Sequence, residues 1–362
     1  MGRPGGVSGW RLRALSPRRA RAFSRPSAAA AAGFGDKLAN PATVPEGTSV
    51  GVAFSPAGDY LAVAHSSGAK VSVYPFSGGT LGTRVAAPAD PPDASQANKV
   101  AFSPDGAFIA LAHNLFSEAT IAVYPWSAGF GVKVSDPATV PAGSSNGVAF
   151  SPDGAYLAVA HANSPRFSVY PWSGAGFGAK LADPATLPEG TGLGVAFSPD
   201  GAYIAVSHGG GSRFSVYPFS GGVIGARLAY PASVPPNNGN GVTFSPDGAY
   251  LAVAHTTLPY IAVYPFSGGA IGVKLADPAT LPTGQGNMVA FSPDGLYMAV
   301  AHATSPRLSV YNFSGGAIGS KISNPSTLPA FTGNDVKWNP AGTYLAVAHG
   351  VSPNLSVYEW TN

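Results

Sequence analysis

One recurring phrase constrains the fold of this chain more than any other feature. It consists of an aromatic residue, Ser-Pro-Asp-Gly, a short alternating strand and a histidine, and its clearest copy runs from Phe150 to His161. A period of this length is typical of repeat architectures, in which each unit packs against its neighbours. The opening aromatic returns every 47 or 48 residues, at Phe54, Phe102, Phe150, Phe197, Phe244, Phe291 and Trp338.

Each unit is predicted to form four short strands. In the unit that contains Phe150, the alternating apolar runs lie at 148–150, 156–160, 167–170 and 179–182. The turn after the first run carries Pro at its second position and Gly at its fourth, which suits type I geometry. Runs this short, interrupted by 47 glycines and 35 prolines in 362 residues, predict strands rather than helices. We therefore expect an all-β chain.

A count of the strands predicts that the repeats close into a ring. The first three strands of the unit occur seven times after residue 50, whereas the fourth occurs only six times. The stretch 33–40 matches the end of a unit, as comparison with 176–183 shows. An N-terminal strand would thus complete the last unit and remove two exposed sheet edges. The predicted fold is a seven-bladed β-propeller of four-stranded antiparallel blades over residues 33–362, closed by residues 33–40 as an outer strand.

The phrase Phe-Ser-Pro-Asp-Gly, followed by an alternating strand and a strand that ends Ser-Val-Tyr, resembles the WD-repeat propellers and their bacterial and viral relatives. The resemblance covers residues 33–362, with Tyr170-Pro171 standing where that family carries Trp-Asp. The near-identical units are also similar to repeat propellers encoded among phage structural genes. This resemblance implies a propeller fold and a structural or attachment protein of a virion.

Residues 1–32 are predicted to be a separate, Arg-rich N-terminal segment. Residues 1–35 hold seven of the 20 basic residues and no acid, which leaves 13 basic against 17 acidic groups in the remainder. Because acidic groups outnumber basic groups in the predicted ring, we do not expect a nucleic-acid interface on it. The segment has three interpretations: a targeting peptide, which would place the protein in an organelle, an arm that docks on a protein partner or acidic surface, or a misplaced start codon. An arm of the second kind favours a virion or an extracellular surface.

Some site chemistries are excluded by composition and pattern. The chain has no cysteine, which excludes disulfides and thiolate metal sites. No stretch approaches the 18 or more apolar residues of a membrane span. Two stretches, 47–51 and 143–147, match G-x-S-x-G, but neither precedes a helix, so no nucleophile elbow is expected.

All the histidines fall at one position of the repeat, directly after the second strand. Neighbouring copies would lie on the order of 10 Å apart, because adjacent strands are about 4.8 Å apart, whereas a zinc–nitrogen bond is about 2.1 Å. We therefore expect no metal or cofactor, and we predict that each histidine bonds to a nearby loop. The predicted structural ring is His65, His113, His161, His208, His255, His302 and His349.

The loops after these histidines differ most between units and form the predicted binding face. Four end in a base, and two carry an aromatic residue. Such a rim could bind an anionic or sugar ligand through arginine hydrogen bonds and aromatic stacking. Alternatively, the bases pair with Asp136, Asp183 or Asp277 of neighbouring loops. The candidate residues are Lys70, Phe116, Arg166, Arg213, Tyr260 and Arg307.

No unit visibly breaks the repeat symmetry with paired titratable groups, so no catalytic residue is predicted. We expect a non-catalytic binding or scaffold module that contacts a protein assembly or surface glycans through the loop face, such as a component of a phage virion. Two alternatives remain open: a lectin-like carbohydrate-binding propeller, and a hydrolytic, lactonase-like propeller enzyme.

Overall fold

The computed structural model describes residues 1–2, 32–114 and 119–362. Residues Ala32–Asn362 form one compact unit. The bulk of the predicted N-terminal segment, residues 3–31, and the candidate residue Phe116 lie outside the described residues. Within the described ranges every regular element is a strand, and no helix suited to crossing a membrane is found.

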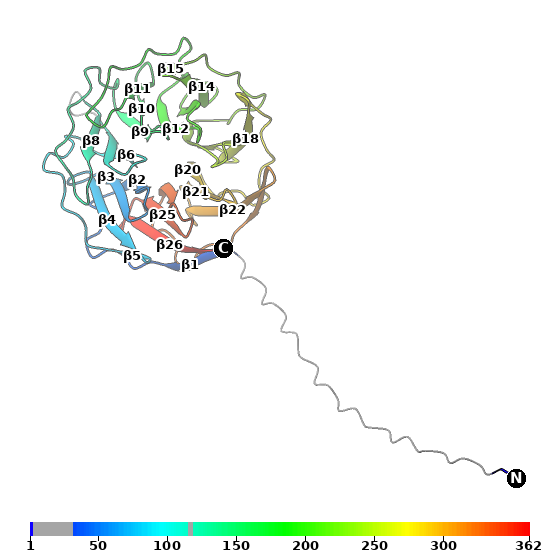
Figure 1. Ribbon diagram of the computed structural model, residues 1–362. Helices are drawn as coiled ribbons and strands as arrows, with labels where there is room; N and C mark the ends of the chain where they lie inside the picture. Colours follow the sequence, from blue (N-terminus) through cyan, green and yellow to red (C-terminus); the bar gives the residue numbers. More distant parts are fainter. Residues whose placement is uncertain (3–31, 115–118) are drawn as a thin grey trace. The chain divides into compact units, whose positions relative to one another are not determined.

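Seven antiparallel sheets are arranged as blades around a common axis (Figure 1). The innermost strands are β2 (Ser49–Phe54), β6 (Ala97–Phe102), β9 (Ser145–Phe150), β12 (Gly192–Phe197), β16 (Gly239–Phe244), β20 (Gly286–Phe291) and β24 (Gly333–Trp338). The second strands are β3 (Tyr60–His65), β7 (Phe108–His113), β10 (Tyr156–His161), β13 (Tyr203–His208), β17 (Tyr250–His255), β21 (Tyr297–His302) and β25 (Tyr344–His349). The third strands are β4 (Val71–Ser77), β8 (Ile121–Pro125), β11 (Phe167–Pro171), β14 (Phe214–Ser220), β18 (Ile261–Ser267), β22 (Leu308–Ser314) and β26 (Leu355–Thr361). The outer strands are β1 (Gly33–Lys37), β5 (Thr80–Leu81), β15 (Val223–Ile224), β19 (Ala270–Ile271) and β23 (Ala317–Lys321).

The second strands form the core because both of their faces are covered by neighbouring blades. In β10, Leu157 and Val159 pack in one apolar cluster, whereas Ala158 and Ala160 pack in the next cluster along the ring. All four side chains are fully buried. Each large residue removed from water stabilises the fold by about 1.5–3 kcal/mol. The alternation of large and small residues lets successive blades interdigitate.

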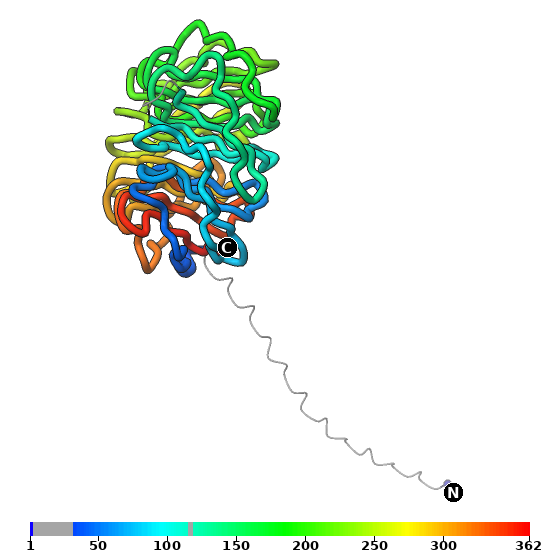
Figure 2. The backbone as a smooth tube through the Cα atoms, turned by 90° about the vertical axis from the view of Figure 1, so that its left-hand side faces the viewer, coloured from blue at the N-terminus to red at the C-terminus, as the bar shows by residue number. Residues whose placement is uncertain are grey.

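The closure of the ring by an N-terminal strand is confirmed. Strand β1 pairs antiparallel with β26, with Phe34 opposite Trp360, and the sheet order is β1-β26-β25-β24. Leu38 N donates to Val357 O at 2.8 Å, the same bond that Leu181 N makes to Val169 O in a blade built from continuous chain. The blue start and the red end of the compact unit lie side by side in both views (Figures 1 and 2).

The outer strands are shorter than predicted in the blades that carry a proline in the third strand. The predicted strand at 179–182 is wrong: the outer pairing there is a single bridge between Trp172 and Phe177, and another blade has only the bridge Trp126–Phe130. The carbonyl of Pro171 accepts a bond from Gly178 N on the outer side, where the proline itself has no N–H to donate. Outer strands of five residues occur in the two blades that carry Asn312 or Glu359 instead.

A circle of seven aromatic pairs joins each blade to the next. The aromatic residue that opens each second strand meets, edge to face, an aromatic residue of the neighbouring third strand or, for Trp126 and Trp172, one directly after it, with ring centroids 4.8–5.2 Å apart. Each pair contributes about 0.5–1.5 kcal/mol beyond its area burial. The last pair crosses the junction between the first and last blades. The pairs are Tyr60–Trp126, Phe108–Trp172, Tyr156–Phe219, Tyr203–Phe266, Tyr250–Phe313, Tyr297–Trp360 and Tyr344–Phe76.

Candidate functional site

The loop face is the side of the propeller that bears the loops between second and third strands. In six blades the residue that ends this loop has a left-handed backbone, with φ between 64° and 78°. A tight turn imposes this conformation: Arg166 N donates to Asn163 O at 2.7 Å, and Arg166 O accepts from His161 N at 2.9 Å. These residues therefore occupy one equivalent position in each blade. They are Lys70, Arg166, Arg213, Tyr260, Arg307 and Asn354.

The four bases on this face do not pair with the aspartates of neighbouring loops, so that alternative is wrong. Asp136 pairs with Lys133 of its own loop at 3.0 Å, and Asp183 and Asp277 are bound in the same way by Lys180 and Lys274. The bases instead contact backbone carbonyls. Lys70 Nζ donates to Ser66 O at 3.2 Å, Arg213 Nη2 to Pro236 O at 3.5 Å, Arg307 Nη1 to Pro329 O at 3.2 Å, and Arg166 to Ala162 O.

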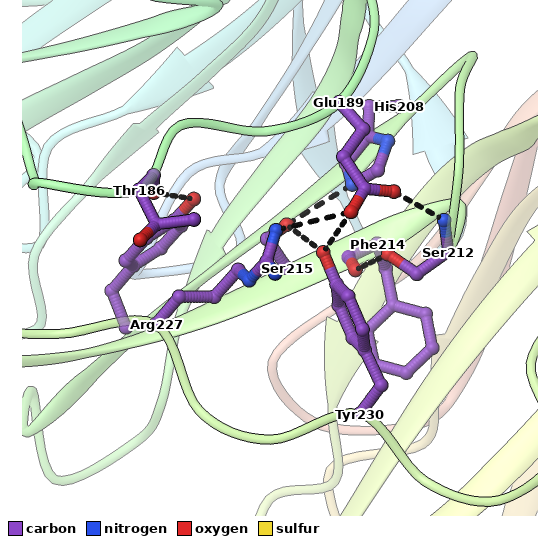
Figure 3. A network of polar contacts seen from close by, with 9 residues as sticks. Thr186, Glu189, His208, Ser212, Phe214, Ser215, Arg227 and Tyr230 are labelled. Carbon is purple, nitrogen blue, oxygen red and sulfur yellow. Dashed lines mark hydrogen bonds and ion pairs between the residues drawn. The ribbon is translucent and has the colours of Figure 1, made fainter.

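Glu189 organises a polar network beside the loop that carries Arg213 (Figure 3). Its carboxylate accepts bonds from Ser212 N at 2.8 Å, from Arg227 Nη1 at 3.3 Å and from the Tyr230 hydroxyl at 3.3 Å. Burial alone would raise the pKa of Glu189, but the Ser212 bond, the Arg227 charge and the Tyr230 bond lower it. Glu46 pairs with Arg84 at 2.7 Å in the corresponding place of the first blade. Both acids are thus matched by their own arginine.

All seven histidines are buried, but the prediction that each one bonds to a nearby loop is only partly confirmed. Within the described residues, Nδ1 of His208 and of His302 has no hydrogen-bond partner, and His255 has none on either ring nitrogen. The Nε2 of His255 lacks a partner because Ala262 stands where most other third strands carry a serine. Nδ1 contacts a loop carbonyl in His65, His113, His161 and His349.

His161 Nδ1 lies 3.0 Å from the loop carbonyl Asn163 O, and His161 Nε2 lies 2.9 Å from Ser168 Oγ. His65 contacts its own loop carbonyl through Nδ1 at 2.9 Å. His349 makes the same two contacts as His161. Burial lowers the pKa of His161, His208, His255, His302 and His349 to about 4. These rings are therefore neutral at pH 7.

The central channel contains a charged group that the sequence reasoning missed. At the inward positions of the first strands most blades carry Gly or Ala, but three charged side chains enter the channel: Lys99 from β6, and Asp335 and Lys337 from β24. We call these three residues the channel charges. The expectation that no unit breaks the repeat symmetry with paired titratable groups is therefore wrong. A column-by-column comparison of the seven first strands would have found them.

Two of the channel charges form an ion pair across the junction of the ring. Lys99 Nζ lies 2.9 Å from Asp335 Oδ2, and the Asp335 side chain is only 1% exposed. The same oxygen accepts a bond from Val52 N at 3.2 Å. The intervening blade carries Gly51, where a Cβ would lie 2.9 Å from Lys99 Cα. A larger residue at Gly51 would therefore collide with the backbone from which Lys99 reaches Asp335.

The two mouths of the channel differ in chemistry. Near Lys337 the channel widens into a cavity of about 530 Å³, whose lining comprises the opening aromatics, six of the turn prolines, small apolar residues, and polar residues such as Ser55, Thr243 and Asn339. We call this cavity the aromatic funnel, and its rings are Phe54, Phe102, Phe150, Phe197, Phe244, Phe291 and Trp338. On the loop face the other mouth, of about 250 Å³, is lined by five asparagines. Their amide nitrogens donate to carbonyls of the next blade, as Asn146 Nδ2 does to Gly192 O at 2.8 Å.

Comparison with known proteins supports the fold and adds no function. No protein-family model matches the chain, and no curated protein sequence matches it. The chain is similar to a solved structure of Kuenenia stuttgartiensis hydrazine synthase, with a TM-score of 0.67 and 18% identity, over 88% of this chain and 97% of that one. At this identity the likeness shows the fold alone. The resemblance to WD-repeat and phage propellers is therefore supported only as far as the propeller fold.

Proposed function

We propose that this propeller is a non-catalytic binding or scaffold module whose loop face docks on a partner that carries anionic groups. One observation carries the proposal: a single backbone position, repeated around the ring, presents Lys70, Arg166, Arg213 and Arg307, and among the described residues no carboxylate pairs with any of these bases. Bases that contact only carbonyls keep their charge available for an anionic partner.

The repetition of this position favours a partner that is itself repetitive. Several weak contacts made at once raise the overall affinity far above that of one contact, provided that their spacings match. A virion lattice or a glycan-covered surface meets this condition. The finer hypothesis is therefore a structural or attachment component of a larger assembly such as a phage virion, and it rests on the similarity of the units to phage repeat propellers.

The burial of the histidines and the ion pair of Asp335 support a non-catalytic role. General acid–base catalysis needs a group whose pKa lies near the working pH and which can reach a substrate. The histidines with a pKa of about 4 are buried, and Asp335 is held in an ion pair. A turnover that chelators abolish would instead support the hydrolytic alternative.

The test compares two triple variants that remove the same charge from different places. The arginine variant changes Arg166, Arg213 and Arg307 to Ala. The lysine variant changes Lys133, Lys180 and Lys274 to Ala, and these three lysines already pair with aspartates. Both are tested on arrays of sulfated, sialylated and neutral glycans, and by co-sedimentation with phage particles, at low and high salt.

We expect salt-sensitive binding to anionic glycans or particles that the arginine variant loses and the lysine variant keeps. Binding of neutral glycans that depends on Tyr260 would favour the lectin alternative. The proposal is wrong if the arginine variant binds as well as the unmodified protein, or if no anionic surface is bound.

A further inference from the structure

Of the three channel charges, Lys99 and Asp335 form an ion pair, and Lys337 is left without an opposite charge as its partner among the described residues. Asp335 is satisfied by Lys99 and by Val52 N. Lys337 is a second cation beside this pair, and within the described residues its ammonium makes no hydrogen bond and has no carboxylate at ion-pair distance. The channel therefore has a net charge of +1 with one ammonium unmatched.

Packing does not require a lysine at position 337. The equivalent inward position is alanine in five other blades, namely Ala53, Ala101, Ala149, Ala196 and Ala290. Lys337 is half-buried and its side chain lines the channel, so its ammonium is available to a molecule that enters there. Burial lowers the pKa of Lys337, the Asp335 charge opposes this effect, and the Lys99 charge adds to it. A lysine that lines the channel and makes no hydrogen bond within the described residues, where the fold accepts alanine, points to a role outside packing.

The surroundings of Lys337 indicate what its partner would be. Lys337 lines both the aromatic funnel, of about 530 Å³, and a narrow section of about 60 Å³ beneath it, which Val100, Val148 and Val195 also line. Cavities of roughly 300–1,000 Å³ are typical of small-molecule sites, and the wall of this one combines the aromatic and proline groups with polar groups such as those of Ser55, Thr243 and Asn339. A ligand that suits both features has an apolar body and one negative charge.

We infer that the channel is a second binding site, which takes small amphipathic carboxylates with the apolar body in the aromatic funnel and the carboxylate on Lys337. The ion pair between Lys99 and Asp335 lies beside the bound headgroup and leaves the surplus charge on Lys337. This site is separate from the loop face, so it stands or falls independently of the function proposed above.

Three probes of equal chain length test the headgroup: octanoate, 1-octanol and octylammonium, titrated into the full chain by calorimetry at pH 7. We expect octanoate to bind most tightly and octylammonium least. Lys337→Ala should weaken octanoate binding about 10- to 100-fold, the range expected for loss of a charge-assisted hydrogen bond. The same variant should leave octanol binding unchanged. Because Ala occupies this position in five blades, the variant should fold.

A second measurement does not depend on any variant. Octanoate should protect Lys337 from acetylation by acetic anhydride, as read by mass spectrometry of the peptides, while Lys274 on the outer surface reacts as before. The matched variant Lys274→Ala should bind octanoate like the unmodified protein. The inference is overturned if octanoate and octanol bind equally, if Lys337→Ala binds octanoate unchanged, or if no probe binds saturably.

Discussion

Mild acid should unfold this protein cooperatively, because its histidines are buried in their neutral form. For His161 burial lowers the pKa from 6.5 to about 4, and four more histidines share that value. An unfolded chain protonates its histidines as the pH falls through 6.5, whereas the folded chain does not until about 4. The associated stability is therefore complete above pH 6.5 and is lost between pH 6.5 and pH 4.

The expected size of this effect is comparable with the whole stability of the domain. Between pH 7 and pH 5 each such histidine lowers the free energy of unfolding by roughly 2 kcal/mol, since one pKa unit corresponds to about 1.4 kcal/mol. Five of them together amount to roughly 10 kcal/mol, against a typical total of about 5–15 kcal/mol. Near pH 5 the slope should be roughly 6 kcal/mol per pH unit.

Urea denaturation, followed by tryptophan fluorescence and circular dichroism from pH 7.5 to pH 5, measures this slope. His161→Gln, which cannot titrate in this range, should lower the slope by about one bound proton. Ser168→Ala removes the partner of His161 Nε2 but keeps the ring. It should lower stability at pH 7 by about 1 kcal/mol and leave most of the slope in place.

Two results would refute this reasoning. One is a free energy of unfolding that stays constant between pH 7 and pH 5. The other is a histidine titration by nuclear magnetic resonance in which the folded rings protonate near pH 6.5. Either result would mean that water or a nearby anion compensates the burial of the rings.

Two further predictions concern ring closure and the Glu189 network. Deleting residues 33–40 should expose two sheet edges and cause aggregation or dimerisation, visible by light scattering, whereas deleting residues 1–32 should leave the melting temperature unchanged; equal melting of both truncations contradicts this. Gly211→Ala would place a Cβ 1.3 Å from Glu189 Oε2, so the free energy of unfolding measured in urea should fall by about 1–3 kcal/mol. The control Gly221→Ala has a similar φ of 55° and no atom within 4 Å of the added Cβ, so it should show only the backbone cost of about 1 kcal/mol. Equal losses in the two variants would exclude the Glu189 contact.

The number of blades and their closure could be predicted from the sequence because both depend on repetition and counting. The opening aromatic marks each blade, and a fourth strand missing at one end and present at the other requires the ends to meet. The position of the outer strands could not be predicted in this way. It depends on the missing N–H of residues such as Pro171, which acts across the sheet on a different strand.

The candidate site likewise has one part that the sequence could predict, the loop-face bases, and one part that it could not, the channel charges. The loop-face bases were found because each follows a marker that repeats along the chain, although only the structure gave their contacts with carbonyls. The sequence by itself therefore determined the blade, the number of blades and the face on which they vary. Only the tertiary structure decided that Lys99 meets Asp335, 236 residues away, across Gly51, with Lys337 beside them. The physical reason is that side chains at the axis become neighbours only when seven first strands converge, and they converge only in a closed ring.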